Sequence, residues 1–447
     1  MSNQVLSYDA DADIDVESAA DELGQQLAPL DAGYSEQVEM HQEDARPIPR
    51  ISIQAFCEGA ATAETIQVAA EDRRLAKAHV SVHMGGATAA VAHYQDSPTP
   101  NLIVLESTLP RADMLAELGR LAECCDAGTK VVVVGHMNDV VLYRELLKRG
   151  VSEYLVAPIT PIQFMEAIST LYNDPDADPV GHVMAFVGGK GGVGSSTICH
   201  NASWAISEVL RSDVCIADLD LAFGTTGLDF NQDPIQGIAD ALGSPERLDE
   251  VLLDRLLTKC SDHLSIFAAP VVLDKEWDLS PDACAMVLDV VRQNVPHVMI
   301  DLPHTWTAWM KAILLQADEI VITAAPDLAN LRNAKNLIDL AAQNRKNDKP
   351  PRLIVNMANM PRRQEIPVAE FAGHLGLEPL AVIEFDSDSF SKAATNGMMV
   401  EEYSPKAAAA QQFRELAFAL TNKQEQRNDK KQASALAPFL EMLNIKR

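Results

Sequence analysis

Short hydrophobic runs alternate with amphipathic stretches along the chain from residue 51 onward. The first of these runs are ISIQAF, NLIVLES, KVVVVG and SEYLVA, and helical patterns such as MLAELGRLAEC and DVVLYRELLKRG lie between them. Strands that alternate with helices are typical of a parallel sheet with helices on its faces. The pattern therefore predicts an α/β domain over residues 49–173, followed by a linker in the Asp- and Pro-rich segment NDPDADPVG.

A second series of the same kind begins at HVMAFVGG. Its predicted strands are VMAFVG, VCIADLD, LSIFAA, HVMIDLP, EIVITAAP, RLIVNMA and LAVIEF, with helical segments between them. This pattern is typical of a doubly wound sheet and predicts a second domain over residues 181–424. The expected fold class is therefore α/β, with two doubly wound parallel-sheet domains.

The two ends of the chain differ in composition from the rest. Residues 1–48 are rich in acids, contain no Lys or Arg before Arg46 and have few large apolar side chains, which predicts a disordered acidic tail. Residues 425–447 are expected to form a charged linker and a short amphipathic segment, ALAPFLEMLNIKR. Because this segment contains an acid and has basic residues only at its end, we expect packing or weak interface contact, with any membrane contact at most peripheral.

Composition narrows the function classes. The chain has 447 residues, with 64 Asp and Glu against 36 Lys and Arg, and a formal net charge of −28. Such a charge disfavours nonspecific binding to nucleic acid, which needs Lys and Arg to neutralise phosphates. No apolar run reaches the roughly 18 residues of a membrane-spanning helix, and the acidic amino terminus is unlike a secretory signal. The seven cysteines lack C-x-x-C spacing, which favours reduced thiols, and we expect a cytoplasmic protein.

The segment GGKGGVGSST, residues 188–197, lies between a predicted strand and a predicted helix. A phosphate-binding loop of the pattern G-x-x-x-x-G-K-[ST] requires this context. Ser195 stands where that pattern has lysine, but backbone N–H groups and the helix dipole can still bind phosphate. The hydroxyl of Ser196 can ligate Mg²⁺. The candidate nucleotide-binding residues of this segment are Gly189, Lys190, Gly191, Gly192, Val193, Gly194, Ser195, Ser196 and Thr197.

Three acids follow predicted strands of the second domain. Asp218 and Asp220 end one strand and are expected on one face, because side chains alternate along a strand. Asp301 follows another apolar strand and matches the acid that holds Mg²⁺ in phosphate-loop proteins. We therefore expect a metal site formed by Ser196, Asp218 and Asp301.

The loop resembles that of the MinD/ParA ATPases, whose pattern x-K-G-G-x-G-K-[ST] carries an early lysine. The resemblance covers about residues 181–420 and implies ATP and Mg²⁺ as cofactors. It also implies a homodimer in which Lys190 contacts the partner's nucleotide. Asp220 would help to position the attacking water, so Lys190 and Asp220 are the candidate catalytic residues. By the same resemblance Asn356, in a late strand, is expected near the adenine.

Ser195 departs from the family pattern. The missing lysine would contact the β- and γ-phosphates, and such a charge-assisted contact is worth about 1.5–3 kcal/mol. ATP binding should weaken but persist, because backbone N–H groups and Mg²⁺ remain. Hydrolysis should suffer more, because that charge stabilises the transition state. We therefore expect weak or absent turnover.

The first domain resembles a response-regulator receiver whose chemical positions are all altered. Glu106 stands at the end of the third strand, where receivers have the acceptor Asp, and Pro110 follows it. Gly135 and Ala157 replace the later hydroxyl and lysine residues, and Glu58 is all that remains of the acidic pair after the first strand. The resemblance implies an interaction module rather than a phosphorylation switch. The alternative, another small flavodoxin-like domain, leads to the same functional conclusion.

Together, the altered receiver and the loop G-G-K-G-G-V-G-S-S-T resemble the CpaE/TadZ family of pilus assembly proteins. The resemblance implies a nucleotide-dependent, dimerising localisation and assembly factor for type IVb (Flp/Tad) pili. Its implied partners are pilus secretion components or polar localisation factors, at a cell pole or peripheral to the inner membrane. The alternative is a ParA/MinD-type positioning ATPase, which would need a basic surface for DNA partition or a basic amphipathic helix for division-site placement. A transcriptional regulator is disfavoured because no helix-turn-helix pattern is visible.

Overall fold

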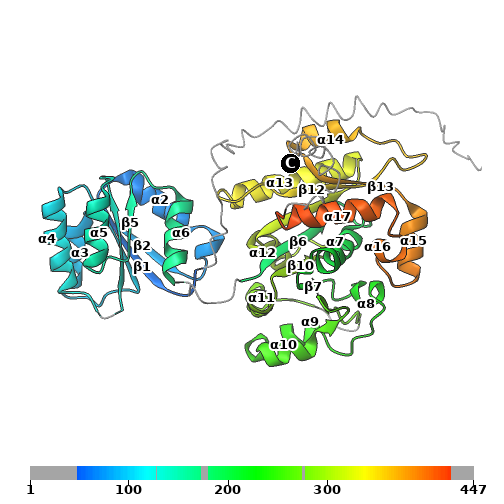
Figure 1. Cartoon of the computed structure of the whole chain (residues 1–447), viewed down its shortest axis with the longest axis horizontal. Helices are drawn as coiled ribbons and strands as arrows, with labels where there is room; N and C mark the ends of the chain where they lie inside the picture. Colours follow the sequence, from blue (N-terminus) through cyan, green and yellow to red (C-terminus); the bar gives the residue numbers. More distant parts are fainter. Residues whose placement is uncertain (1–47, 127, 173–179, 274–276, 424–447) are drawn as a thin grey trace, which may run out of the picture.

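The computed structural model describes residues 48–126, 128–172, 180–273 and 277–423. The predicted acidic tail, apart from its last residue, and the predicted segment 425–447 lie outside these ranges. Two largely parallel sheets organise the described residues, one within residues 52–156 and the other within residues 182–384 (Figure 1). No helix in the described ranges is long and apolar enough to cross a bilayer.

The first sheet has five strands. They are β1 (Ser52–Cys57), β2 (His79–Met84), β3 (Leu102–Ser107), β4 (Lys130–Gly135) and β5 (Glu153–Val156). All pairs are parallel and the order is β2-β1-β3-β4-β5, which is the order of flavodoxin-like doubly wound folds and confirms the predicted fold class. Strand β2 is not among the strands that the hydrophobic pattern predicts, because its sequence HVSVHM interleaves polar residues and it forms a partly exposed edge.

Helices lie on both faces of this first sheet. They are α2 (Ala60–Ala70), α3 (Gly86–Tyr94), α4 (Arg111–Ala122), α5 (Val140–Lys148) and α6 (Pro161–Tyr172), with a short 3-10 helix, η1 (Arg73–Leu75), before β2. Helices α2 and α6 contact each other, and their side chains Ile66 and Phe164 share one core with Ile53 of β1. Helices α3 and α4 contact each other on the opposite face, where Phe56 and Tyr94 are buried.

The second sheet has eight strands. They are β6 (His182–Gly188), β7 (Val214–Asp218), β8 (Thr258–Lys259), β9 (Leu264–Phe267), β10 (His297–Asp301), β11 (Glu319–Ala324), β12 (Arg352–Ala358) and β13 (Pro379–Glu384). Their order is β13-β12-β11-β6-β10-β7-β9-β8, and β8 is antiparallel to β9 whereas the other pairs are parallel. Every strand except the two-residue β8 falls on a predicted apolar run, so the doubly wound fold class is confirmed here too.

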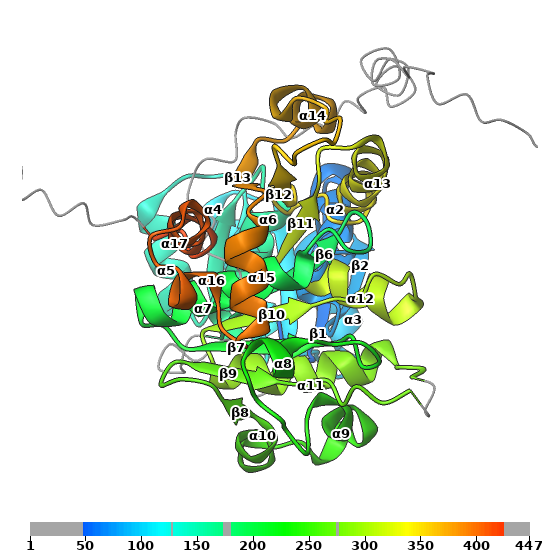
Figure 2. The same cartoon turned by 90° about the vertical axis from the view of Figure 1, so that its right-hand side faces the viewer.

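Successive side chains of the central strand β6 enter two different cores. Val183 and Ala185 lie in one core with side chains of α9 to α14, whereas Met184 and Phe186 lie in another core with side chains of α7 and α15 to α17. Figures 1 and 2 show these helices around the sheet. This burial on both faces explains why the strand is a continuous apolar run in the sequence. The helices are α7 (Ser195–Leu210), α8 (Thr226–Asp229), α9 (Ile238–Gly243), α10 (Glu250–Leu256), α11 (Pro281–Asn294), α12 (Ala308–Gln316), α13 (Leu328–Asn344), α14 (Val368–Leu375), α15 (Ser387–Thr395), α16 (Val400–Tyr403) and α17 (Ala408–Leu420), with η2 (Pro245–Arg247) between α9 and α10.

The first unit contacts the second at the amino-terminal ends of these strands. Asp318 directly precedes β11, and its backbone N–H donates to the carbonyl of Val183 near the start of β6. The side chain of Asp318 in turn binds Arg73 of η1 in the first unit. The glycine-rich loop follows the carboxyl end of β6, so it lies at the opposite edge of the sheet.

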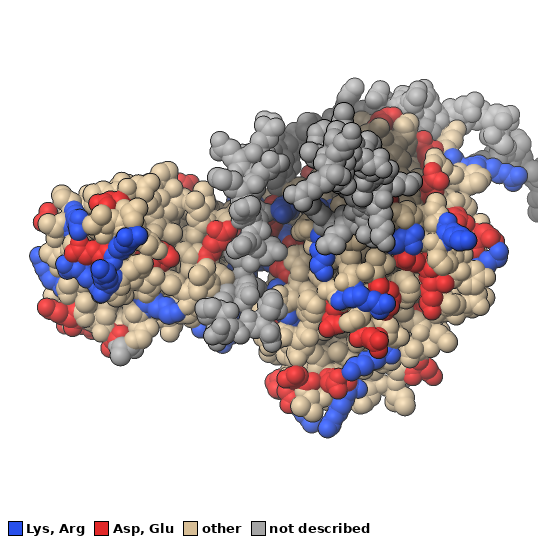
Figure 3. All heavy atoms as spheres, in the orientation of Figure 1, with Lys and Arg blue, Asp and Glu red and all other residues tan. Residues whose placement is uncertain are grey.

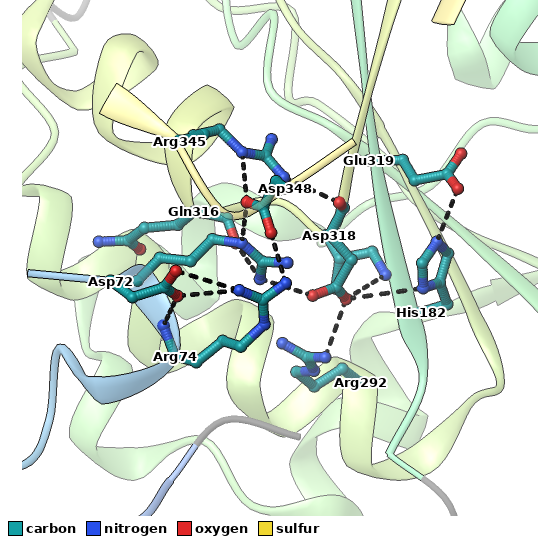
Figure 4. A network of polar contacts seen from close by, with 11 residues as sticks. Asp72, Arg74, His182, Arg292, Gln316, Asp318, Glu319, Arg345 and Asp348 are labelled. Carbon is teal, nitrogen blue, oxygen red and sulfur yellow. Dashed lines mark hydrogen bonds and ion pairs between the residues drawn. The ribbon is translucent and has the colours of Figure 1, made fainter. Parts of the chain in front are cut away.

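A network of buried ions joins the two units at this contact (Figure 4). Arg73 Nη1 donates to Asp318 Oδ1 at 2.8 Å, and Arg73 Nε donates to Asp348 Oδ2 at 2.9 Å. Asp348 also pairs with Arg74 of the first unit and accepts from Arg345 Nε at 2.7 Å. Burial alone would raise the pKa of Asp348, but the charges of the three arginines lower it to about 2. The junction is therefore a charge-paired, largely buried contact.

Candidate nucleotide site

The glycine-rich loop connects β6 to α7 and exposes the start of that helix. Gly194 is the N-cap residue of α7 and has a φ of 87°, a left-handed conformation that disfavours side chains. A Cβ atom on Gly194 would also lie 2.6 Å from Nδ2 of Asn356. The first N–H groups of a helix have no partner within the helix, and here they follow a loop that only glycine can form at this position. The predicted strand, turn and helix are all present, and they create the geometry of an anion site.

Asparagine side chains hold the loop from beneath. Asn356 Nδ2 donates to the carbonyl of Val193 at 2.8 Å, and Asn333 Nδ2 of α13 donates to the carbonyl of Gly189 at 2.8 Å. The N–H of Gly189 donates to the carbonyl of Thr323 in β11 at 2.8 Å. Asn356 thus supports the loop, and its expected place near an adenine remains a prediction. No sequence pattern indicates that Asn333 contacts the loop, because only the packing of α13 brings it there.

Lys190 and Ser195, the two unusual positions of the loop, differ in environment. Lys190 is exposed and makes no side-chain hydrogen bond or ion pair with any other described residue. Ser195 begins α7, and its Oγ is buried without a hydrogen-bond partner among the residues that the structure describes. The loop therefore presents a free cation on its outside and an unpaired hydroxyl where the usual lysine would stand.

The predicted acids lie beneath the loop at the ends of adjacent strands. Asp218 and Asp301 are paired in register across β7 and β10, and they are 0% and 2% exposed. Strand β7 ends at Asp218, so the expectation that Asp220 also ends this strand is wrong. The chain turns after Asp218, and Asp220 lies in the following loop, where its N–H donates to Asp218 Oδ1 at 3.0 Å. Burial and then the charge of Asp301 raise the pKa of Asp218. Two carboxylates side by side in an apolar sheet need a cation nearby.

His200 of α7 supplies a positive charge beside these acids and was not predicted as a site residue. Its Nδ1 lies 2.7 Å from Asp229 Oδ2, and its Nε2 lies 3.0 Å from Thr226 Oγ1 and 3.6 Å from Asp301 Oδ2. Burial alone would lower the pKa of His200, but the carboxylates of Asp229 and Asp301 raise it to about 10. The imidazole is 0% exposed. The only sequence signal is a histidine in an apolar helix one turn after Ser196.

One oxygen of Asp301 is free to bind a magnesium ion. Asp301 Oδ1 is buried and has no hydrogen-bond partner among the described residues, although Oδ2 of the same carboxylate faces His200. Carboxylate and hydroxyl oxygens are the protein ligands that Mg²⁺ prefers, and Mg²⁺ usually keeps several waters and takes further ligands from phosphate. Within the described ranges no group of three or more His, Cys, Asp or Glu side chains forms a preassembled metal site.

In the first unit, the strand-end positions on which the resemblance to receivers rests are filled by the unit's own side chains. Glu106, 2% exposed, accepts from the backbone N–H of Glu58 at 2.8 Å and of Gly59 at 2.7 Å, and from Thr62 Oγ1 at 2.5 Å. Burial would raise the pKa of Glu106, but these hydrogen bonds hold it below its ordinary value. A Cβ atom on Gly135 would collide with the ring and the hydroxyl of Tyr154. The position of the usual hydroxyl residue is therefore taken by a tyrosine from β5.

A doubly wound sheet with a glycine-rich loop at the start of a helix and acids on the adjacent strands defines the class of phosphate-loop α/β proteins. Comparisons with known proteins refine this class. No protein-family model matches the chain. It is 50% identical to a pilus assembly protein CpaE of Caulobacter crescentus CB15, covering 98% of that chain and 29% of this one, with a TM-score of 0.29. By this identity the chain belongs to the CpaE family of pilus assembly proteins, and the resemblance stated from the sequence is confirmed.

Two further relatives agree with this assignment. A structure described as a CpaE2 pilus assembly protein of Sinorhizobium meliloti 1021 is 44% identical, with 99% of that chain and 27% of this one covered and a TM-score of 0.27. The septum site-determining protein MinD of Bacillus subtilis (strain 168) is 25% identical over 257 residues, which are 53% of this chain and 88% of that protein. The expected similarity to MinD is thus confirmed at the level of sequence.

Proposed function

We propose that the protein is an ATP-dependent, dimerising localisation and assembly factor for type IVb pili. The observation that carries the proposal is the loop itself: an open helix start, an exposed and unpaired Lys190, and two buried acids below. Family membership supports the pilus role. The geometry supports nucleotide binding, because free backbone N–H groups at a helix start attract phosphate.

ATP with Mg²⁺ is the proposed ligand of this site. The loop residues 189–197 would bind the phosphates through their backbone, and Ser196, Asp218 and Asp301 would hold Mg²⁺, which supplies charge compensation for the phosphates. Ser195 in place of lysine supports weak or absent hydrolysis. Asp220, which lies beyond the strand end, would position water in any residual reaction.

A second copy of the chain is the proposed partner across the loop. Lys190 has no partner within the described residues of its own chain and would contact the nucleotide of the other copy. Two large side chains in the loops after the acids are also exposed, Phe223 at 70% and Trp306 at 57%. Exposed aromatic residues beside a charged site are typical of interfaces. The exposure of Lys190, Phe223 and Trp306 therefore supports an interface with a second copy on this face of the protein.

The first unit would serve as the contact module for pilus secretion components or polar localisation factors. Its altered site is closed by the hydrogen bonds of Glu106, which supports a fixed interaction surface rather than a phosphorylation switch. Acidic and basic side chains are interspersed on the face of the second unit drawn in Figure 3, and the net charge is −28, which favours protein partners over nucleic acid. A cytoplasmic place at a cell pole or the inner membrane follows from this role.

Calorimetry and sedimentation test the proposal separately. Titration of millimolar ATP with Mg²⁺ into the full chain should show binding, and its absence would refute the nucleotide site. In sedimentation with ATP, Lys190→Ala should lower the dimer fraction while leaving the fold intact by circular dichroism. Lys259→Ala is the matched control, because Lys259 is an exposed lysine of the distant edge strand β8. Equal dimer fractions for Lys190→Ala and the unmodified chain would contradict the role of Lys190 across the interface.

A further inference from the structure

We propose that His200 is a positioning residue that ties the phosphate-binding helix α7 to Asp301 and to the segment 219–230, and so transmits nucleotide binding to that segment. The inference rests on the proposed nucleotide site and adds a residue and a route of regulation to it. Segment 219–230 contains Asp220 and exposed Phe223, so it belongs to the face proposed to meet a second copy.

The contacts of His200 leave neither ring nitrogen free. Nδ1 donates to Asp229 Oδ2 at 2.7 Å, and Nε2 donates to Thr226 Oγ1 at 3.0 Å. Thr226 in turn donates its hydroxyl proton to Asp218 Oδ2 at 2.7 Å, which requires its oxygen to accept from His200. The ring of His200 therefore contacts Thr226 and Asp229, the first and last residues of α8, and through Thr226 it is linked to Asp218.

Asp301 receives the third contact. Its Oδ2 lies 3.6 Å from Nε2 of His200, and its Oδ1 has no partner among the described residues. The imidazole contacts one oxygen of Asp301 and holds the carboxylate in place, so that the other oxygen stays available for a metal. His200 does not touch the loop N–H groups, because it lies more than one turn into α7. Its effect on nucleotide binding should therefore appear only through the metal and through the segment 219–230.

Four variants separate positioning from packing. His200→Leu keeps the volume and removes both polar contacts. His200→Gln can place a donor where Nε2 lies, toward Thr226 and Asp301, whereas His200→Asn can place one where Nδ1 lies, toward Asp229. His263→Leu is the control. His263 also lies 2.7 Å from an aspartate, Asp213, but it directly precedes β9 at the edge of the sheet opposite the loop, and its side chain is partly exposed.

Hydrogen exchange of the nucleotide-free full chain is the first measurement. His200→Leu should raise exchange in residues 219–230 by about tenfold, because a hydrogen bond to a charged group is lost there. His200→Asn should restore most of the protection, and His263→Leu should leave the segment unchanged. Unchanged exchange in His200→Leu would overturn the anchoring.

The second measurement is the ratio of ATP affinities with and without Mg²⁺. We expect His200→Leu to leave the affinity without Mg²⁺ unchanged and to reduce the gain from Mg²⁺ about tenfold. His200→Gln should recover that gain and His200→Asn should not. The proposal would be overturned if His200→Leu lost the same ATP affinity with and without Mg²⁺ and if His200→Gln and His200→Asn behaved alike. His200 would then only fill space in the core. If the unmodified chain bound no ATP, the proposed function would fail, and the exchange result alone would support or overturn the anchoring by His200.

Discussion

Removing the carboxylate of Asp348 should separate the two units of the chain. Asp348 accepts from Arg73 and Arg345 at 2.9 Å and 2.7 Å and also pairs with Arg74, and its side chain is 5% exposed. Asp348→Ala leaves these arginines buried without their acid, and breaking a buried pair in this way costs about 3–5 kcal/mol. The depression of its pKa from 3.8 to about 2 corresponds to about 2.5 kcal/mol, which sets the lower end of the expected loss.

Unfolding in urea and small-angle scattering together measure this loss. We expect Asp348→Ala to lower the free energy of unfolding by about 2.5–5 kcal/mol and to enlarge the radius of gyration as the first unit detaches. Asp289→Ala is the control, because Asp289 pairs with Lys77 across the same junction but both side chains are partly exposed, so its loss should stay below about 1 kcal/mol.

The same two variants also test how the free energy of unfolding depends on pH. Because the pKa of Asp348 is lower in the folded protein, its contribution is complete above pH 3.8 and disappears as the pH falls toward about 2. The Asp348→Ala variant should therefore lose less stability over this range than the unmodified chain. An unfolding free energy of Asp348→Ala equal to that of Asp289→Ala, with an unchanged radius of gyration, would refute the buried-network account of the junction.

Three further predictions concern the two sites. Ser195→Lys should tighten ATP binding about tenfold or more by calorimetry and raise ATP hydrolysis in a phosphate-release assay, because it adds the missing charge-assisted contact; unchanged affinity would contradict the role given to Ser195. Gly194→Ala should abolish ATP binding, because its φ of 87° and the 2.6 Å approach to Asn356 leave no room for a Cβ; retained binding would show that the loop relaxes. Glu106→Ala should destabilise the first unit by about 1–3 kcal/mol, because buried donors such as Thr62 lose their acceptor. Thermal unfolding measures this loss, and an unchanged unfolding temperature would contradict it.

Most of the fold could be predicted from the hydrophobic pattern, because buried parallel strands are continuous apolar runs bounded by polar turns. The exceptions are β2 and β8, an edge strand with interleaved polar residues and a pair of residues too short for any pattern. Neither strand buries both faces, so neither carries the signal that the central strands do.

The site was predictable only where the chain itself carries a local motif. Asp218 and Asp301 are neighbours because adjacent parallel strands end at the same edge of the sheet, and this placement can be anticipated from the strand pattern. His200 and Asn333 contribute through tertiary packing, and a single buried histidine or a surface asparagine of a helix has no distinctive pattern. The junction at Asp348 is equally invisible in the sequence, because its partners Arg73 and Arg74 are about 275 residues away.

Native mass spectrometry of the full chain with Mg²⁺ and ATP tests the central claim most directly. Nucleotide-dependent dimerisation predicts a species of two chains carrying two nucleotides, which disappears when ATP is withheld and is reduced by Lys190→Ala. A single chain that carries one nucleotide at saturating ATP, with no paired species, would contradict nucleotide-dependent dimerisation.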